Sequence, residues 1–118
     1  MTEARKQAER LGRLAEALAA LALRLKGYRV LHRRWRCHLG EIDLVVRRGN
    51  AVAFVEVKAR PDRDSAAMAV TGRQRRRIAR AAAAYLAANG HLAALSLRYD
   101  VVLVTPWRWP RHIADAWR

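Results

Sequence analysis

Three ionisable residues, Asp43, Glu56 and Lys58, interrupt two apolar stretches that are typical of neighbouring strands. Glu56 and Lys58 are two residues apart, so both side chains point to the same face of an extended chain. Asp43 precedes Glu56 by 13 residues, and a turn at Arg48-Gly49-Asn50 would fold the two carboxylates onto one face of a hairpin. Two close carboxylates repel each other and are costly to bury unpaired. A divalent cation removes both difficulties, and Mg²⁺ is commonly held by one or two carboxylates, water and a substrate phosphate.

The lysine of this group extends the chemistry beyond metal binding. Lys58 is predicted to point into the same site, where its ammonium group could orient an attacking water or stabilise the charge of a cleaved phosphate. The alternative is structural, because Asp43, Glu56 and Lys58 would also form an ion-pair cluster on an exposed sheet face. The residues alone leave both interpretations open.

The composition favours a polyanionic partner. The 118 residues include 24 Lys and Arg against 10 Asp and Glu, a net charge of +14 at pH 7. A surface this basic attracts polyanions, and nucleic acid is the first candidate. The length fits a single domain over residues 1–118.

The same composition argues against several other classes of protein. No stretch approaches the ~20 apolar residues of a membrane span, so no membrane partner is expected. The polar N-terminus does not resemble a secretory signal. A single cysteine, Cys37, cannot form an internal disulfide or a cysteine-rich zinc site. Together these features predict a cytoplasmic protein.

A long helix is predicted from Thr2 to Lys26. Leucines recur along it at alternating spacings of three and four and form one apolar face, at Leu11, Leu14, Leu18, Leu21 and Leu25. A second stripe on the same helix, termed the small-residue stripe, includes the small residues Gly12 and Ala19 together with Glu16 and Leu23. Small residues allow another element to approach closely, which would place Glu16 in the middle of that contact.

The remaining elements are predicted in the order strand, strand, strand, helix, strand. The three strands cover residues 28–35, 39–47 and 51–59, and a polar connection over 61–71 leads to a helix at 73–88. A fourth strand is predicted at 96–104, followed by a tail from Thr105 that contains Trp107, Trp109 and Trp117 and ends polar. This order predicts an α/β fold, a mixed sheet with helices packed on it.

Arginines gather on one face of the second helix, at Arg73, Arg76, Arg77 and Arg80. Arginine contacts to phosphates give affinity without sequence preference, so this face is the candidate nucleic-acid interface. A solvated basic face is the alternative. Trp35, Trp107 and Trp109 could stack on unpaired bases, although core or interface positions are the more ordinary role for tryptophan. His91 and His112 are expected at the surface.

Two motifs resemble the PD-(D/E)xK nuclease superfamily: Gly-Glu-Ile-Asp-Leu-Val at 40–45 and Phe-Val-Glu-Val-Lys-Ala-Arg at 54–60. The chain is most similar to the YraN family of small bacterial endonuclease-like proteins, which is related to archaeal Holliday junction resolvases. The similarity covers most of the chain. It extends to Glu16 in the first helix, to Gly27-Tyr28 and to residues 82–86, 98–102 and 114–117.

The resemblance implies a restriction-endonuclease-like core with the order αβββαβ, in agreement with the predicted elements. It implies that Asp43 and Glu56 ligate Mg²⁺ or Mn²⁺ and that Lys58 is the catalytic lysine. Glu16 would be a further catalytic residue that reaches the metal directly or through water, with a solvated helix glutamate as the alternative. Glu41 is expected to face away from Asp43 and to be the weaker candidate ligand.

The function implied by the resemblance is that of a metal-dependent DNA endonuclease, acting on branched or single-stranded DNA in recombination or repair. The alternatives are a catalytically inactive or partner-dependent nucleic-acid-binding module, and an RNA- or ribosome-associated basic protein. A homodimer and a helicase-like protein partner are further options of the resemblance. Gln74 stands where related sequences usually carry lysine, and it is grouped with the arginines because its amide can still hydrogen-bond a phosphate.

Overall fold

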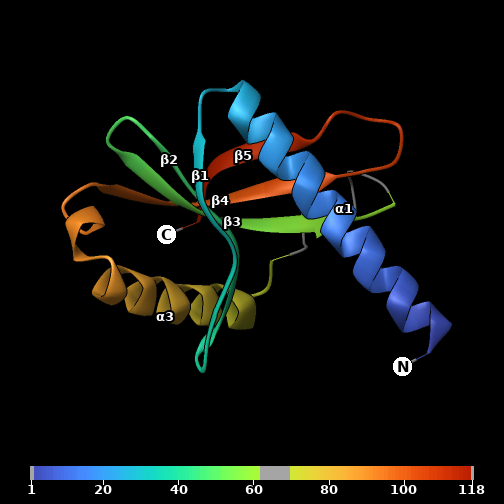
Figure 1. Cartoon of the computed structure of the whole chain (residues 1–118), viewed down its shortest axis with the longest axis horizontal. Helices are drawn as coiled ribbons and strands as arrows, with labels where there is room; N and C mark the ends of the chain where they lie inside the picture. The colour runs from blue at the N-terminus through green and yellow to red at the C-terminus, as the bar shows by residue number, and fades with distance from the viewer. Residues whose placement is uncertain (1, 62–69, 118) are drawn as a thin grey trace.

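The computed structural model describes residues 2–61 and 70–117 of the chain. Of the predicted connection at 61–71, residues 62–69 lie outside the described residues. These described residues fold as two long helices and one sheet (Figure 1). The elements are α1 (Glu3–Leu25), β1 (Arg29–Cys37), β2 (Gly40–Arg48), β3 (Ala51–Ala59), α3 (Gly72–Ala88), a short 3₁₀ helix (Gly90–Leu92), β4 (Ser96–Val104) and β5 (Arg111–Trp117).

The sheet has five strands in the order β1-β2-β3-β4-β5. Strands β3 and β4 are parallel and are connected through α3, whereas every other neighbouring pair is antiparallel. The predicted α/β class and the αβββαβ order are confirmed, with β5 added at the edge. The alternation of apolar residues does not predict this last strand. Its register against β4 shifts between Tyr99 and Val101, so its buried positions do not alternate.

Each face of the sheet has its own apolar core beneath one helix. Leu44, Val46 and Val55 pack with the alanines of α1 on one face. Val45 and Phe54, their neighbours in sequence, pack with α3 on the other face. Strands covered on both faces are apolar in consecutive positions, which explains the nearly unbroken hydrophobic runs of β2 and β3. The sheet therefore lies between α1 and α3 as a central layer.

The face of α1 that packs on the sheet consists mainly of alanines and includes Ala19 and Leu23 of the small-residue stripe, whereas most of the leucine stripe is exposed. The buried residues of α1 are Ala15, Ala19, Ala20, Ala22 and Leu23. Leu14 and Leu25 instead remain 55% and 70% exposed. Alanines allow the helix to approach the sheet more closely than leucines would, and this close approach brings Glu16 inward. Among the described residues, no helix is both long and apolar enough to span a membrane.

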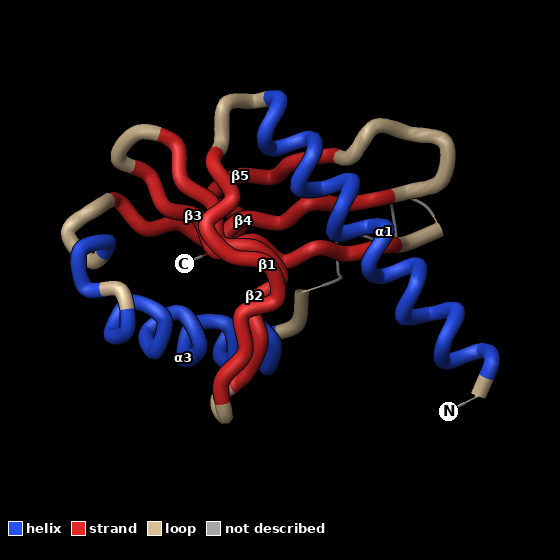
Figure 2. Tube along the Cα trace, viewed as in Figure 1, coloured by secondary structure: helices blue, strands red, loops and turns tan. Residues whose placement is uncertain are grey.

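The β1–β2 hairpin leaves the plane of the other strands and its tip lies beside α3 (Figure 2). Gly40, the first residue of β2, makes this approach possible. Its φ is +155°, a conformation that L side chains rarely adopt, and a Cβ at this position would lie 3.3 Å from the carbonyl oxygen of Arg77. The missing side chain therefore sets the separation between the hairpin and α3.

Replacing Gly40 with valine is expected to lower the free energy of unfolding by about 1–3 kcal/mol, because the branched side chain meets helix backbone that cannot move aside easily. Urea denaturation measures the effect. Gly12→Val is the matched control, since a Cβ at Gly12 has no neighbour within 4 Å. Equal stability of the Gly40→Val protein and the wild type would show that the hairpin does not depend on this contact.

Candidate functional site

The separation of β2 from β3 creates the candidate site. Their pairing runs from Arg48↔Ala51 to Leu44↔Val55, and beyond this point the two strands diverge. Asp43, the next residue of β2, fills the opening and accepts a 2.8 Å hydrogen bond from the backbone N–H of Val57 to its Oδ2. The side chain of Asp43 thus replaces the carbonyl that would have continued the ladder. One of its carboxylate oxygens remains available for other contacts.

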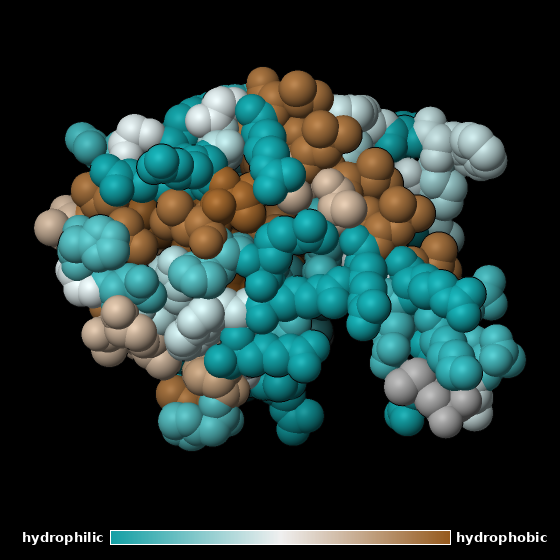
Figure 3. Space-filling model, in the orientation of Figure 1, coloured by the Kyte–Doolittle hydropathy of each residue, from teal (hydrophilic) through white to brown (hydrophobic). Residues whose placement is uncertain are grey.

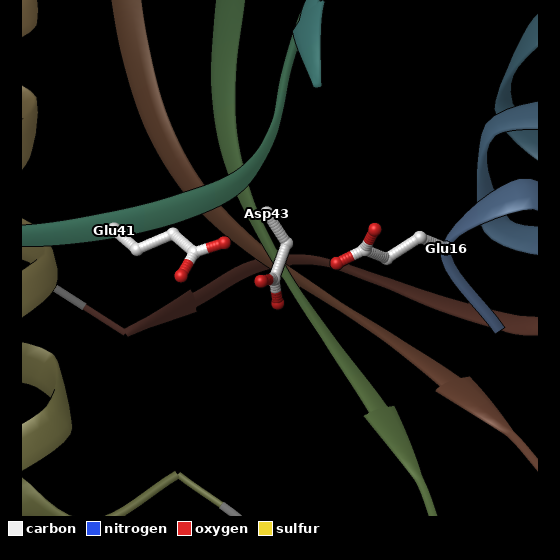
Figure 4. A group of neighbouring side chains, drawn as sticks. All are labelled: Glu16, Glu41 and Asp43. Carbon is white, nitrogen blue, oxygen red and sulfur yellow. The ribbon is translucent and has the colours of Figure 1, made fainter. Parts of the chain in front are cut away.

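Three carboxylates meet at this opening (Figure 4). Glu16 reaches it from α1, and Glu41 and Asp43 reach it from β2, with one oxygen of each lying within 4.8 Å of the others. Figure 4 shows Asp43 between the two glutamates, which point toward it from opposite sides. The arrangement has the size and the donor set of a cation site, since hard cations such as Mg²⁺ prefer carboxylate oxygens.

The expectation that Glu41 faces away from Asp43 is wrong. The two residues are separated by two positions along β2, so their side chains share a face of the strand. Glu41 therefore joins the carboxylate group, and the sequence contains the parity that predicts it. The inward position of Glu16 agrees with the small-residue stripe around it, and its side chain is only 12% exposed.

Two basic side chains form ion pairs with acidic residues of the site, Lys58 with Glu56 and Arg34 with Glu16. Lys58 Nζ lies 3.0 Å from Glu56 Oε1, and both of these side chains are largely buried. The guanidinium of Arg34 donates from Nε to Glu16 Oε2. Arg34 adopts a left-handed backbone conformation, with φ of +52°, at the position in β1 that lies between partners of Ile42 and Leu44. Such conformations in a residue other than glycine are strained and cluster at functional sites.

The acidic residues open onto a small cleft between the hairpin and the start of α3. The cleft measures about 160 Å³ and is lined by Glu41, Asp43, Glu56, Gln74, Arg77 and Ile78. Gln74 Oε1 accepts a hydrogen bond from the backbone N–H of Thr71, and Thr71 Oγ1 accepts one from the N–H of Gln74. This reciprocal cap ties the side chain of Gln74 to the helix N-terminus. Its amide NH₂ group is then the part that can donate to a phosphate.

Burial changes the protonation of the central carboxyl group. The pKa of Asp43 rises from 3.8 to about 8, first because burial penalises the charged form and then because the charge of Glu56 repels it. Glu16 and Glu41 add to the rise, and the hydrogen bond from Val57 opposes it. Without a cation, Asp43 is therefore protonated at neutral pH. Cation binding must displace this proton, so affinity for the cation should increase with pH up to about 8.

The raised pKa of Asp43 predicts a pH-dependent stability of the metal-free protein. In the unfolded chain Asp43 ionises near pH 3.8, but in the folded chain it keeps its proton until about pH 8. Its contribution to folding is therefore fully present below pH 3.8 and is lost as the pH rises to about 8. A one-unit difference in pKa corresponds to about 1.4 kcal/mol.

Denaturation in EDTA tests this dependence when wild type is compared with Asp43→Asn, which carries no titratable group at the position. The stability of the variant relative to the wild type should increase as the pH rises from about 6 to about 8. A difference between the two proteins that is independent of pH would contradict the assignment.

The arginines of α3 lie where the helical spacing predicts. Arg73, Arg76, Arg77 and Arg80 are all exposed, opposite the buried residues Ile78, Ala81, Ala82 and Tyr85. Arg77 lines the acidic cleft and also an adjoining one bounded by residues 36–41. The candidate nucleic-acid interface therefore borders the carboxylates directly.

The motif at residues 98–102 belongs to a structural network. Asp100 is fully buried and accepts hydrogen bonds from Arg98, from His112 Nε2 and from the backbone N–H of Asp115. Burial alone would raise its pKa, but these bonds outweigh burial and lower the pKa to about 2. Arg98 also donates to Tyr28 Oη at the end of α1. The expectation of a surface role for His112 is wrong, because its side chain is 5% exposed within this network.

The tryptophans divide between core and surface. Trp35 packs edge-on against Tyr85, with ring centroids 5.2 Å apart, and Trp117 stacks on Tyr99 at the same centroid separation. Trp107 and Trp109 are instead among the exposed large hydrophobic residues. The ordinary structural role therefore holds for Trp35, and the loop after β4 carries two free indole surfaces.

Comparison with known proteins places the chain within one family. A model of the uncharacterised protein family UPF0102 matches residues 15–104. A UPF0102 protein of Parvibaculum lavamentivorans is 63% identical over 94% of this chain and 84% of the relative. A UPF0102 protein of Methylocella silvestris is 56% identical over 89% of this chain and 85% of the relative. One from Paramagnetospirillum magneticum is 54% identical over 99% and 94%, respectively.

Proposed function

We propose that this chain, which belongs to the uncharacterised protein family UPF0102, is a metal-dependent endonuclease that hydrolyses phosphodiester bonds in DNA. One observation carries the proposal: three carboxylates converge on one point, with Glu56 and Lys58 beside them, in a protein of net charge +14. Acidic residues are scarce in this chain. Their concentration at one cleft is therefore the opposite of what a uniformly basic surface would give.

The donor set fits Mg²⁺ or Mn²⁺. All the candidate ligands are carboxylates, and within residues 2–61 and 70–117 the lining of the cleft includes no soft donor such as cysteine. Asp43 and Glu41 would ligate the ion from β2 and Glu16 from α1, and Glu56 of β3 lines the same cleft. When bound, the ion supplies Lewis-acid polarisation of the phosphate and lowers the pKa of a water molecule.

The basic side chains of the site have separate roles in this proposal. Lys58 is held beside Glu56 at 3.0 Å, so its ammonium group is positioned to orient the attacking water and to stabilise charge that develops on the phosphate. Arg77 lines the cleft and would bind the phosphate backbone there. The exposed arginines further along α3 would extend this contact to neighbouring phosphates without reading base sequence.

A cleavage assay tests the proposed function. Labelled single-stranded, duplex, flap and four-way-junction DNA would be incubated with the protein in Mg²⁺, Mn²⁺ or EDTA. Cutting should require the metal and disappear in Glu56→Gln, which removes one charge from the cleft. Glu9→Gln is the matched control, because Glu9 is an exposed residue of α1. The preferred DNA form would identify the substrate.

Two results would contradict the proposed function. DNA binding without cutting in either metal would contradict the nuclease and favour a module that binds nucleic acid and is inactive or requires a partner. Equal cutting by wild type and Glu56→Gln would remove the acidic cleft from the mechanism.

A further inference from the structure

The leucines of one face of α1 form an apolar stripe, here termed the leucine seam: Leu11, Leu14, Leu18, Leu21 and Leu25. All of them are exposed except Leu18, which is half-buried. Figure 3 shows hydrophobic side chains gathered along α1, bordered by hydrophilic ones. The alternating spacing of three and four is that of a coiled-coil seam, whose usual partner is another helix with the same spacing. The seam is separate from the acidic cleft and has no part in the proposed nuclease chemistry.

The two halves of the leucine seam differ in their surroundings. Leu11, Leu14 and Leu18 line a groove of about 620 Å³, whose opposite wall includes Trp107 and Trp109. Leu21 and Leu25 lie one and two turns beyond Leu18, are 45% and 70% exposed, and are not part of the groove lining. One helix thus carries an apolar groove at one end and projecting leucines at the other.

We propose that the leucine seam binds a second copy of this chain, with the two α1 helices antiparallel about a twofold axis. Such an axis places Leu21 and Leu25 of each copy at the groove of the other. An isologous interface requires a surface that is complementary to itself, and a groove and a projection on one helix satisfy this requirement. In the register favoured by the heptad, Leu14 packs against Leu25 of the partner subunit and Leu18 against Leu21 of the partner subunit.

The available apolar surface is sufficient for a stable dimer. A standard interface buries about 800 Å² on each partner. A fully exposed indole buries about 150–250 Å², and Trp109 is 58% exposed, so Trp107 and Trp109 together supply about a third to a half of that area. The leucines of the seam supply much of the rest. Residues 2–14 are all exposed, so the N-terminal half of α1 projects from the sheet (Figure 1), and Leu14 at its end would gain packing that it lacks in the monomer.

Charge distinguishes a second copy from other occupants of the same surface. Exposed Arg10, Arg13 and Arg24 flank the seam, and each copy carries a net charge of +14. Two copies repel each other, so screening by salt should strengthen the dimer. An acidic peptide or an anionic membrane would bind the same basic, apolar surface more weakly as salt increases.

Sedimentation of the full-length protein across a range of concentrations and salt tests the dimer. The wild type should show twice the mass of 13.4 kDa, with association that becomes tighter in salt. Leu25→Glu should remain monomeric at concentrations where the wild type is dimeric, because it places a charge in the partner's groove. Leu97→Glu is the control: Leu97 is a 43% exposed leucine of β4 outside the groove lining, and this variant should dimerise.

A charge exchange tests the antiparallel register. Leu14→Glu and Leu25→Lys should each be monomeric alone, and their mixture should form a heterodimer in which glutamate meets lysine in one layer and leucine meets leucine in the other. A monomeric wild type, or a Leu25→Glu protein that dimerises as well as the wild type, would overturn the proposal. A monomer that sediments with vesicles of anionic phospholipid would assign the surface to a membrane instead. None of these results depends on nuclease activity.

Discussion

Replacing Lys58 with methionine should lower the rate of DNA cleavage about 100- to 1000-fold, the loss that typically follows removal of one group that stabilises developing charge. Methionine keeps most of the length of the side chain and removes the ammonium group that lies 3.0 Å from Glu56. Binding of Mn²⁺ should persist, because Glu56 loses its cationic partner and the three clustered carboxylates are unchanged.

The pairing of lost cleavage with retained Mn²⁺ binding separates a catalytic lysine from a structural one. Single-turnover cleavage and calorimetric titration of the same sample provide both measurements. Lys6→Met is the matched control, since Lys6 is an exposed residue of α1 with a surface ion pair to Glu3. Cleavage by Lys58→Met at the wild-type rate would reduce Lys58 to a partner of the buried Glu56.

The second large effect is expected at Asp43, the residue between the two glutamates. Asp43→Asn should weaken Mn²⁺ binding by about 100-fold or more, because changes even to residues behind a metal ligand commonly cost about 10- to 100-fold. The variant should fold, since the asparagine Oδ1 can still accept the hydrogen bond from Val57. In EDTA at pH 8 it should also be more stable than the wild type, because a repelled carboxylate is replaced by a neutral amide.

Titration calorimetry with Mn²⁺ measures this affinity, and Glu3→Gln controls for the loss of one negative charge at an exposed position. Unchanged affinity in Asp43→Asn would place the cation elsewhere or exclude it from the cleft. Greater stability without lower affinity would mean that the carboxylates repel one another but do not share a metal.

Much of the fold follows from local patterns in the sequence. The predicted bounds of α1 differ from the observed ones only by its capping residues Thr2 and Lys26. Both ends are marked in the sequence, because Thr2 caps the N-terminus and a glycine follows Lys26. Strands β3 and β4 begin and end as predicted, since both are short apolar runs bounded by turn residues. The edge strand β5 could not be predicted in this way, because a shifted register against β4 breaks its alternation.

Which face of α1 is buried depends on a contact that periodicity does not encode. Hydrophobicity alone favours the leucine seam, but the alanine face permits a closer approach to the sheet, and all the leucines of the seam except Leu18 remain exposed. The choice depends on shape complementarity between two elements. The leucines have the spacing of a coiled-coil seam, and this spacing can be interpreted only when the alanine face of α1 is known to be the buried one.

The sequence is sufficient to predict the central residues of the candidate site but not the contact between Arg34 and Glu16. Strand parity and a hairpin turn bring Asp43, Glu56 and Lys58 together, and parity also predicts Glu41 once the two-residue spacing is applied. The contact between Arg34 and Glu16 joins residues 18 positions apart on a strand and a helix. This contact depends on how α1 crosses the sheet and on the left-handed backbone conformation of Arg34. No local sequence pattern predicts either of these features.

The most direct test of the metal site is diffraction from crystals grown with Mn²⁺, with data collected near the manganese absorption edge. We expect an anomalous peak bounded by Glu16, Glu41 and Asp43, with metal–oxygen distances typical of a hard cation. Crystals that contain Mn²⁺ in the solvent but show no peak there, with Arg34 and Lys58 still paired to Glu16 and Glu56, would contradict the central claim.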